Sequence, residues 1–136
     1  MRAVRLSKTF GIATFAIFAL GAFAPARSAP DARFHIKLAR SMPAAGDVNG
    51  DGVAEVKLWF SEPIELGVSS VKLTGPTGTA IPLGKLKRAD AADAPVVATL
   101  TKPLTEDGKY KITWKAASSD GHPATGTVDF TVRIKR

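Results

Sequence analysis

Hydrophobic and polar residues alternate with a period of two along most of the chain after Asp31. The alternation is clearest over residues 55–60, 110–116 and 127–134. A period of two puts successive side chains on opposite faces of a β-strand, so each segment predicts a strand with one face in a core and the other in water. Shorter strands are predicted over His35–Arg40, Val68–Thr74, Thr79–Leu83 and Val96–Leu100.

Turn-forming segments separate these predicted strands. They are Gly46–Gly52, Gly75–Gly78 and Thr105–Gly108, all rich in glycine with Asp, Asn, Thr or Pro. No long segment of helical period follows residue 31. About seven short strands in roughly 100 residues are typical of an antiparallel Greek-key β-sandwich, so we predict an all-β domain of the immunoglobulin-like or cupredoxin-like kind.

The first 28 residues have a different character. Three basic residues near the start precede an apolar run over residues 10–23, and small residues follow at 24–28. This is the layout of a secretory signal peptide, and the run is shorter than the roughly 20 residues that a membrane span needs. We therefore expect export to the periplasm with removal of residues 1–28, and no stable membrane insertion afterwards. An uncleaved membrane anchor is the alternative.

Removal of this segment would leave a short tail, one domain and a smaller net charge. Residues 29–34 are predicted to form a short tail and residues 35–136 one domain. The formal net charge of the whole chain is +7, but residues 1–28 hold four of the 19 basic residues and none of the 12 acidic ones, which leaves +3. This small excess does not indicate a nucleic-acid partner. The chain has no cysteine, which excludes disulfides and thiolate metal sites.

The two histidines occupy chemically suggestive positions. His122 stands in an Asp-x-His turn with Asp120, and His35 stands where the predicted domain begins. Alternating side chains would put Asp120 and His122 on the same side of the chain, and His35 would complete a set of two nitrogens and one oxygen. Such a set suits Cu(II), although zinc accepts the same atoms. The alternative is structural: Asp120 and His122 form a capped turn, and His35 is an ordinary surface residue.

Three blocks of the sequence resemble the CopC copper-resistance proteins, in the same order and over essentially the whole mature chain. The first block has the opening His-x-x-Leu and then Ser-x-Pro-Ala-x-Gly, the second has Phe-Ser-Glu-Pro-Ile, and the third has Gly-x-Tyr, Trp, Ser-x-Asp-Gly-His-Pro, Gly and Phe-x-Val. The three blocks are, in this order, His35–Gly46, Leu58–Glu65 and Gly108–Val132.

The resemblance implies a small periplasmic β-sandwich that binds Cu(II) and hands copper on beside an inner-membrane transporter of the CopD kind. The Cu(II) ligands of that family map onto His35, Asp120 and His122. In many members the first histidine is the mature N-terminus, and its amine also binds copper. Here Phe34 precedes it, so we do not expect an amine ligand. The methionines are Met1 and Met42 alone, so a multi-methionine Cu(I) site is not expected.

A second metal site is conceivable in the segment 47–55. Asp47, Asn49, Asp51 and Glu55 have the spacing of oxygen ligands in a calcium loop, and Gly52 stands at the sixth position. The bidentate glutamate at position twelve of an EF-hand is missing. The alternative interpretation is a polar turn, because Asn-Gly and Asp-Gly are strong turn formers.

Catalysis is not indicated by the residues present. Ser119 is too close in sequence to Asp120 and His122 for the geometry of a catalytic triad. Glu62 and Glu65 flank a proline and are interpreted as loop or strand-end charges. We therefore predict a copper carrier or buffer and not an enzyme. The alternative is an exported immunoglobulin-like interaction domain with weak or lost copper binding.

Overall fold

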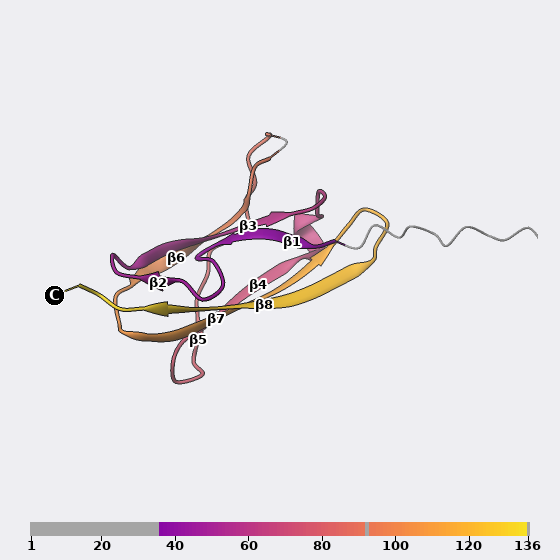
Figure 1. The fold of residues 1–136 in the computed structure, drawn as a ribbon. Coiled ribbons are helices and arrows are strands. Elements are labelled where there is room, and N and C mark those ends of the chain that lie inside the picture. The colour runs from indigo at the N-terminus through magenta and orange to yellow at the C-terminus, as the bar shows by residue number, and fades with distance from the viewer. Residues whose placement is uncertain (1–35, 92, 136) are drawn as a thin grey trace, which may run out of the picture. The chain divides into compact units, whose positions relative to one another are not determined.

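Two β-sheets pack face to face in the computed structural model, which describes residues 36–91 and 93–135 (Figure 1). One sheet has the strand order β1-β3-β6, and the other has the order β2-β8-β7-β4-β5. The predicted signal peptide over residues 1–28, the tail over residues 29–34 and His35 lie outside the described residues. The strands are β1 (Leu38–Met42), β2 (Val48–Asn49), β3 (Val53–Phe60), β4 (Ser70–Thr74), β5 (Ala80–Ile81), β6 (Val96–Leu104), β7 (Gly108–Ala117) and β8 (Pro123–Val132).

The predicted all-β sandwich is therefore confirmed. Among the described residues the one helical element is a short 3-10 turn over Leu66–Val68, and no helix is long and apolar enough to cross a bilayer. The pairing is antiparallel between all neighbouring strands except β2 and β8, which run parallel. The expected turns over Gly75–Gly78 and Thr105–Gly108 join β4 to β5 and β6 to β7.

Strand β2 was not predicted, because the segment Gly46–Gly52 has the composition of a turn. In the structure the middle of that segment lies along the edge of β8. The N–H of Thr131 donates to the Asp47 carbonyl (2.8 Å), and the N–H of Arg133 donates to the Asn49 carbonyl (2.9 Å). The edge of β8 thus satisfies backbone groups that a free turn would leave to water.

The core lies between the two sheets and is built from the apolar positions of the alternating pattern. In β7 the residues at 110, 112, 114 and 116 are buried while those at 109, 111, 113 and 115 are exposed. Tyr110 stacks on Phe130 with ring centroids 5.5 Å apart. The side chains that are almost completely buried are Leu58, Leu73, Ile112, Val56 and Val132. Alternation in the sequence is thus the direct consequence of one buried face per strand.

The residue opposite Trp114 in the β7–β8 ladder has no room for a side chain. Gly126 faces Trp114 across the two strands. A Cβ on Gly126 would lie 2.5 Å from the Trp114 ring, which is far inside contact distance. The ring also meets Phe60 edge-on at 5.3 Å, so it is held from the other sheet as well. The ladder continues to the pair Ala117–Pro123, and residues 118–122 form the connecting loop.

Candidate metal centre

The loop between β7 and β8 begins with a tight turn that positions Asp120 and His122. The Ser118 carbonyl accepts a hydrogen bond from the N–H of Gly121 at 2.9 Å, which closes a turn over residues 118–121. Gly121 has a φ of +82°, a conformation that costs glycine nothing and other residues much more. The chain then turns back into β8 with His122 directly before the strand.

Asp120 is the centre of the hydrogen bonds in this loop. Its Oδ1 accepts from the Ser118 hydroxyl and from the N–H of His122 at 3.2 Å. Its Oδ2 lies 3.0 Å from Nδ1 of His122. Ser118 is buried, whereas the side chains of Asp120 and His122 are 59% and 63% exposed. The structure therefore brings the predicted pair together, and it presents the pair to solvent.

These contacts keep Asp120 ionised. The hydrogen bond from Ser118 is the largest cause that lowers the pKa of Asp120 to about 2, and the backbone and side chain of His122 add to it. Hydrogen bonds to a carboxylate favour the charged form, because each donor stabilises the negative charge. At neutral pH the loop thus offers a carboxylate oxygen as a metal ligand without having to lose a proton.

The geometry also selects the atoms that a metal would meet. Nδ1 of His122 faces Asp120, so Nε2 is the ring nitrogen left for a metal, and the carboxylate fixes the orientation of the ring. Because Oδ1 of Asp120 already accepts two hydrogen bonds, Oδ2 is the oxygen available to an ion. Oδ2 has one such contact, with Nδ1 of His122, and so keeps a lone pair for an ion.

Hydrogen bonds connect this loop to the beginning of β1. The Ala117 carbonyl accepts from the N–H of Glu65 at 2.8 Å, which ties the base of the loop to the segment after β3. Earlier in that segment, the N–H of Ser61 donates to the Lys37 carbonyl at 2.8 Å, and the Ser61 hydroxyl accepts from the N–H of Lys37 at 2.9 Å. The loop and the start of β1 therefore lie at the same end of the sandwich (Figure 1).

The third predicted ligand cannot be followed in the same way. His35 lies outside the described residues, so its role as a ligand stays a prediction. Within residues 36–91 and 93–135, no three side chains of the His, Asp and Glu kind gather in a manner that suits a metal ion. Asp120 and His122 are thus a pair of donors, which needs a further ligand from elsewhere to hold an ion firmly.

Comparison with known proteins decides the family. The CopC domain model matches residues 38–133, which is most of the described chain. The chain belongs to the CopC domain family. This confirms the resemblance found in the sequence, and it agrees with the two-sheet architecture.

Three relatives are similar to this CopC domain over most of their own length. Copper resistance protein C of Pseudomonas syringae pv. tomato is 37% identical over 107 residues, which cover 75% of this chain and 83% of the relative. The crystal structure of CopC from Methylosinus trichosporium OB3b matches with a TM-score of 0.67 and 27% identity, covering 75% of this chain and 97% of the other. PcoC, a methionine-rich copper resistance protein from Escherichia coli, matches with a TM-score of 0.62 and 31% identity, covering 73% and 99%.

The sequence analysis missed two polar residues at this end of the CopC domain. Ser118 is buried and holds Asp120, and the pattern Ser-x-Asp before a glycine was the available signal. Glu62 lies in a loop as expected, but its Oε1 is buried and has no hydrogen-bond partner among the described residues. A buried carboxylate oxygen without a donor is costly, so Glu62 is an unusual polar group in this loop.

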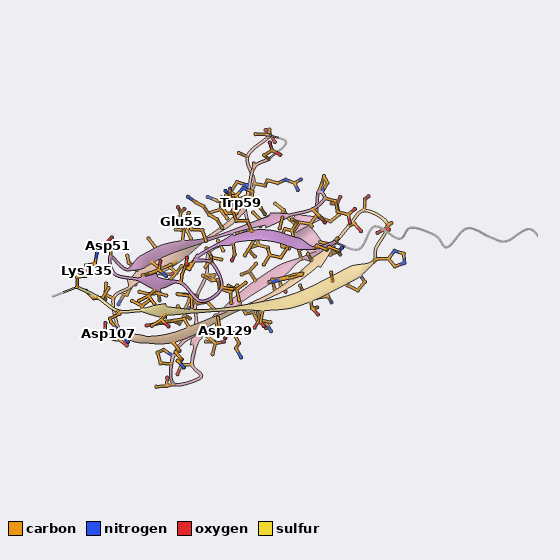
Figure 2. All side chains as sticks on the ribbon, viewed as in Figure 1. Asp51, Glu55, Trp59, Asp107, Asp129 and Lys135 are labelled. Carbon is orange, nitrogen blue, oxygen red and sulfur yellow. The ribbon has the colours of Figure 1, made fainter. Side chains whose placement is uncertain are left out.

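The calcium site considered for the segment 47–55 is not supported. The Oδ2 of Asp47 accepts the N–H of Ala44 at 2.8 Å, so this carboxylate closes its own turn. Glu55 lies on β3 and pairs with Lys57 at 2.6 Å on the outer face of the three-stranded sheet. Figure 2 shows Asp51 at one end of the sandwich and Glu55 farther along the strand.

A cationic side chain also lies against this segment. The Lys135 side chain is so close to Gly50 that a Cβ there would meet its Cε at 3.0 Å, and the N–H of Lys135 donates to the Gly50 carbonyl. Asn49 belongs to β2, and its side-chain amide donates toward the Thr131 carbonyl at 3.5 Å. The positive charge of a lysine beside the segment repels a divalent cation. The segment is part of the sheet and not a calcium loop.

Proposed function

We propose that this protein is a periplasmic copper-binding protein that holds Cu(II) with His35, Asp120 and His122 and passes the ion on. The observation that carries the proposal is the exposed Asp120–His122 pair, held in a turn by buried Ser118, in a chain of the CopC family. The names of the relatives add support, because two of the three described above are named copper resistance proteins.

The donor set fits Cu(II) chemically. Imidazole nitrogen and carboxylate oxygen are ligands that Cu(II) accepts readily, and copper stands at the top of the affinity order for such divalent sites. Asp120 is anionic at neutral pH, because its pKa is lowered to about 2, so no proton has to leave the carboxylate when the ion arrives. His35 directly precedes Ile36, the first described residue, in the sequence, and the start of β1 lies at the end of the sandwich that holds the loop.

Exposure of the pair favours a carrier or buffer over an enzyme. Both side chains are more than half exposed, so an ion held there stays accessible to an acceptor. A catalytic metal centre would instead have an enclosed, shaped cavity around its open position. An acceptor of the CopD kind, in the inner membrane, is the partner that the family resemblance favours.

Cu(II) titration at neutral pH tests the proposal, with electron paramagnetic resonance to count the nitrogen ligands. The wild-type chain is expected to bind one ion with nitrogen coupling. His122→Ala and His35→Ala are each expected to weaken binding by more than the roughly 10–100-fold that loss of an outer-shell partner costs. Asp120→Asn tests whether Asp120 binds the ion through its oxygen or only orients the ring of His122. If Asp120 only orients the ring, the nitrogen coupling of the variant stays as in the wild type.

Asp129→Asn is the matched control, since Asp129 is also an exposed carboxylate on the β7–β8 hairpin but lies far along β8 from the loop. It should bind copper as the wild type does. A copper signal that is unchanged in the His35→Ala, His122→Ala double variant would refute the proposal. The chain would then be an exported interaction domain that has lost useful copper affinity.

A further inference from the structure

The outward face of the five-stranded sheet carries an array of lysines. We call the exposed side chains of Lys72 on β4 and Lys109, Lys111 and Lys115 on β7 the lysine face. Asp129 is the one acidic residue on the five strands of this sheet. Four lysines and one aspartate give this face a net charge of +3, as large as that of all residues after position 28 together.

Most of this charge is not neutralised by the protein itself. Lys111 approaches Asp129 only to 3.8 Å, with both side chains more than half exposed. In the part of the chain that the structure describes, Lys72, Lys109 and Lys115 take part in no ion pair. Figure 2 shows Asp129 on this face and Trp59 on the opposite face of the sandwich.

Two cations of the opposite sheet have a partner within the protein. There Lys57 pairs with Glu55 at 2.6 Å, and the guanidinium of Arg40 lies 3.8 Å above the Trp59 ring. An ion pair or a cation–π contact uses part of the attraction that a cation would offer to a partner. Among the cations on the described strands of that sheet, Lys102 alone lacks such a contact, so the lysine face is the sheet surface with the larger unbalanced positive charge.

The arrangement of the lysines is flat and spread out. Strands rise by about 3.4 Å per residue and lie about 4.8 Å apart, so Lys109 and Lys115 are roughly 20 Å apart along β7. Cross-strand neighbours of the lysines are hydroxyl side chains: Thr113 faces Lys72, and Thr125 faces Lys115. Such an array does not converge on one small anion, and it matches an extended anionic surface.

The composition of the face identifies the kind of surface. Cores of protein interfaces are rich in aromatic residues, Met and Arg and poor in Lys. The exposed positions of β4, β7 and β8 hold no aromatic residue, Met or Arg: they are lysines, threonines, Ser70, Pro123 and Asp129. Single-stranded nucleic acids need aromatic side chains for stacking, and duplex grooves need an element that protrudes. An anionic bilayer needs neither, because each basic side chain near it contributes about fivefold in binding regardless of shape.

We propose that the lysine face docks on the headgroups of an anionic phospholipid bilayer. Docking is peripheral and electrostatic, with the sheet lying flat on the membrane surface. Strands β7 and β8 lead directly into the loop of Asp120 and His122, so docking holds that loop at the margin of the bilayer. This last consequence, a copper centre kept close to a membrane acceptor, rests on the proposed function, but the docking itself does not.

The test is sedimentation with vesicles of phosphatidylcholine with or without phosphatidylglycerol, in the absence of copper, using the chain as cells process it. Binding is expected only to vesicles with phosphatidylglycerol, and it should disappear at about 0.5 M salt, where the Debye length is only about 4 Å. Lys109→Gln/Lys115→Gln should weaken binding roughly 25-fold, because two basic contacts are lost. Any contribution of the N-terminal segment is the same in all variants.

The matched control is Lys85→Gln/Lys87→Gln, which removes the same charge from the segment beside β6 in the opposite sheet, where Lys87 pairs with Val97. This pair should bind vesicles nearly as the wild type does. Equal losses in the two double variants would overturn the proposal, because net charge would then explain the binding. Retention on an immobilised acidic polypeptide without vesicle binding would overturn it as well and indicate a protein partner. Since no copper is present, a failed copper titration leaves this result unaffected.

Discussion

Among single residues, Ser118 has the largest influence on the charge state of the loop. Its hydroxyl is the largest cause of the lowered pKa of Asp120, so Ser118→Ala should raise that pKa from about 2 toward the ordinary value of 3.8. A carboxyl titration followed by carbon-detected NMR in the copper-free protein measures the shift. Because the pKa of folded Asp120 is depressed, its stabilising effect is present above about pH 4 and is lost as pH falls toward 2.

Ser119→Ala is the control for this experiment. Ser119 is the exposed neighbour, and it makes no hydrogen bond to Asp120 among the described residues. Its removal should leave the titration of Asp120 where it is in the wild type. A wild-type midpoint already near 3.8 would contradict the hydrogen-bonded geometry of the loop.

Single residues also show which features of the loop the sequence pattern could not predict. The sequence analysis placed Asp120 and His122 together on the assumption of an extended segment, in which residues two apart point the same way. In the structure they meet through a turn instead, in which Gly121 has a φ of +82°. The role of Ser118 did not follow from spacing, since it depends on burial of the hydroxyl at the end of β7. The buried Oε1 of Glu62 was missed for the same reason: burial of one atom in a loop is a property of the tertiary structure.

At the scale of elements, the contact between Gly126 and Trp114 keeps the β7–β8 ladder regular next to the loop. Gly126→Ala would place a Cβ 2.5 Å from the ring of Trp114, a buried side chain that also meets Phe60. Overpacking of this kind costs about 1–3 kcal/mol, so the free energy of unfolding should fall by that amount. Denaturant unfolding measures the loss, and a change in the indole fluorescence reports displacement of the ring.

Gly67→Ala is the comparison, because a Cβ at Gly67 meets nothing within 4 Å. Its effect should be within about 0.5 kcal/mol of zero, as for most surface substitutions. Equal stability of the Gly126→Ala variant and the wild type would show that the ring has room to move, and the tight contact would then not be a constraint on the hairpin.

Strands were predictable in proportion to their length and to the burial of one face. The long alternation over residues 110–116 and 127–134 corresponds to β7 and β8, where one face is buried against the other sheet. Strand β2 has two residues, too few to display a period, and it exists because β8 offers it an edge. The bounds of β1 moved from His35–Arg40 to Leu38–Met42, because pairing with β3 sets them.

At the scale of the whole molecule, the predicted copper ligands come from parts of the chain that are far apart in sequence. His35 and the Asp120–His122 pair are separated by more than 80 positions, so the residue pattern could only suggest that they act together, and the family resemblance named the same three residues. What the structure adds is two sets of hydrogen bonds, one between Lys37 and Ser61 and one between Glu65 and Ala117, and the chain over residues 61–65 connects the two. These bonds make the geometry of the loop depend on the folding of both sheets.

Copper binding should therefore be coupled to global stability. A ligand that binds only the folded protein stabilises it by about 2.7 kcal/mol at a concentration 100 times its Kd. For a domain of this size that raises the melting temperature by roughly 10 °C or more. Scanning calorimetry with and without Cu(II) at pH 7 measures the rise, and the His35→Ala, His122→Ala double variant should lack it.

The same experiment at pH 5 identifies the groups that compete with copper for protons. An imidazole ordinarily takes up a proton near pH 6.5, so each imidazole ligand lowers copper affinity roughly twenty- to thirtyfold between pH 7 and pH 5. Asp120 does not add to this loss, because its pKa of about 2 keeps it ionised throughout that range. The copper-induced rise in melting temperature should therefore shrink at pH 5. A rise of equal size at both values would mean that the copper is bound by groups other than the two histidines.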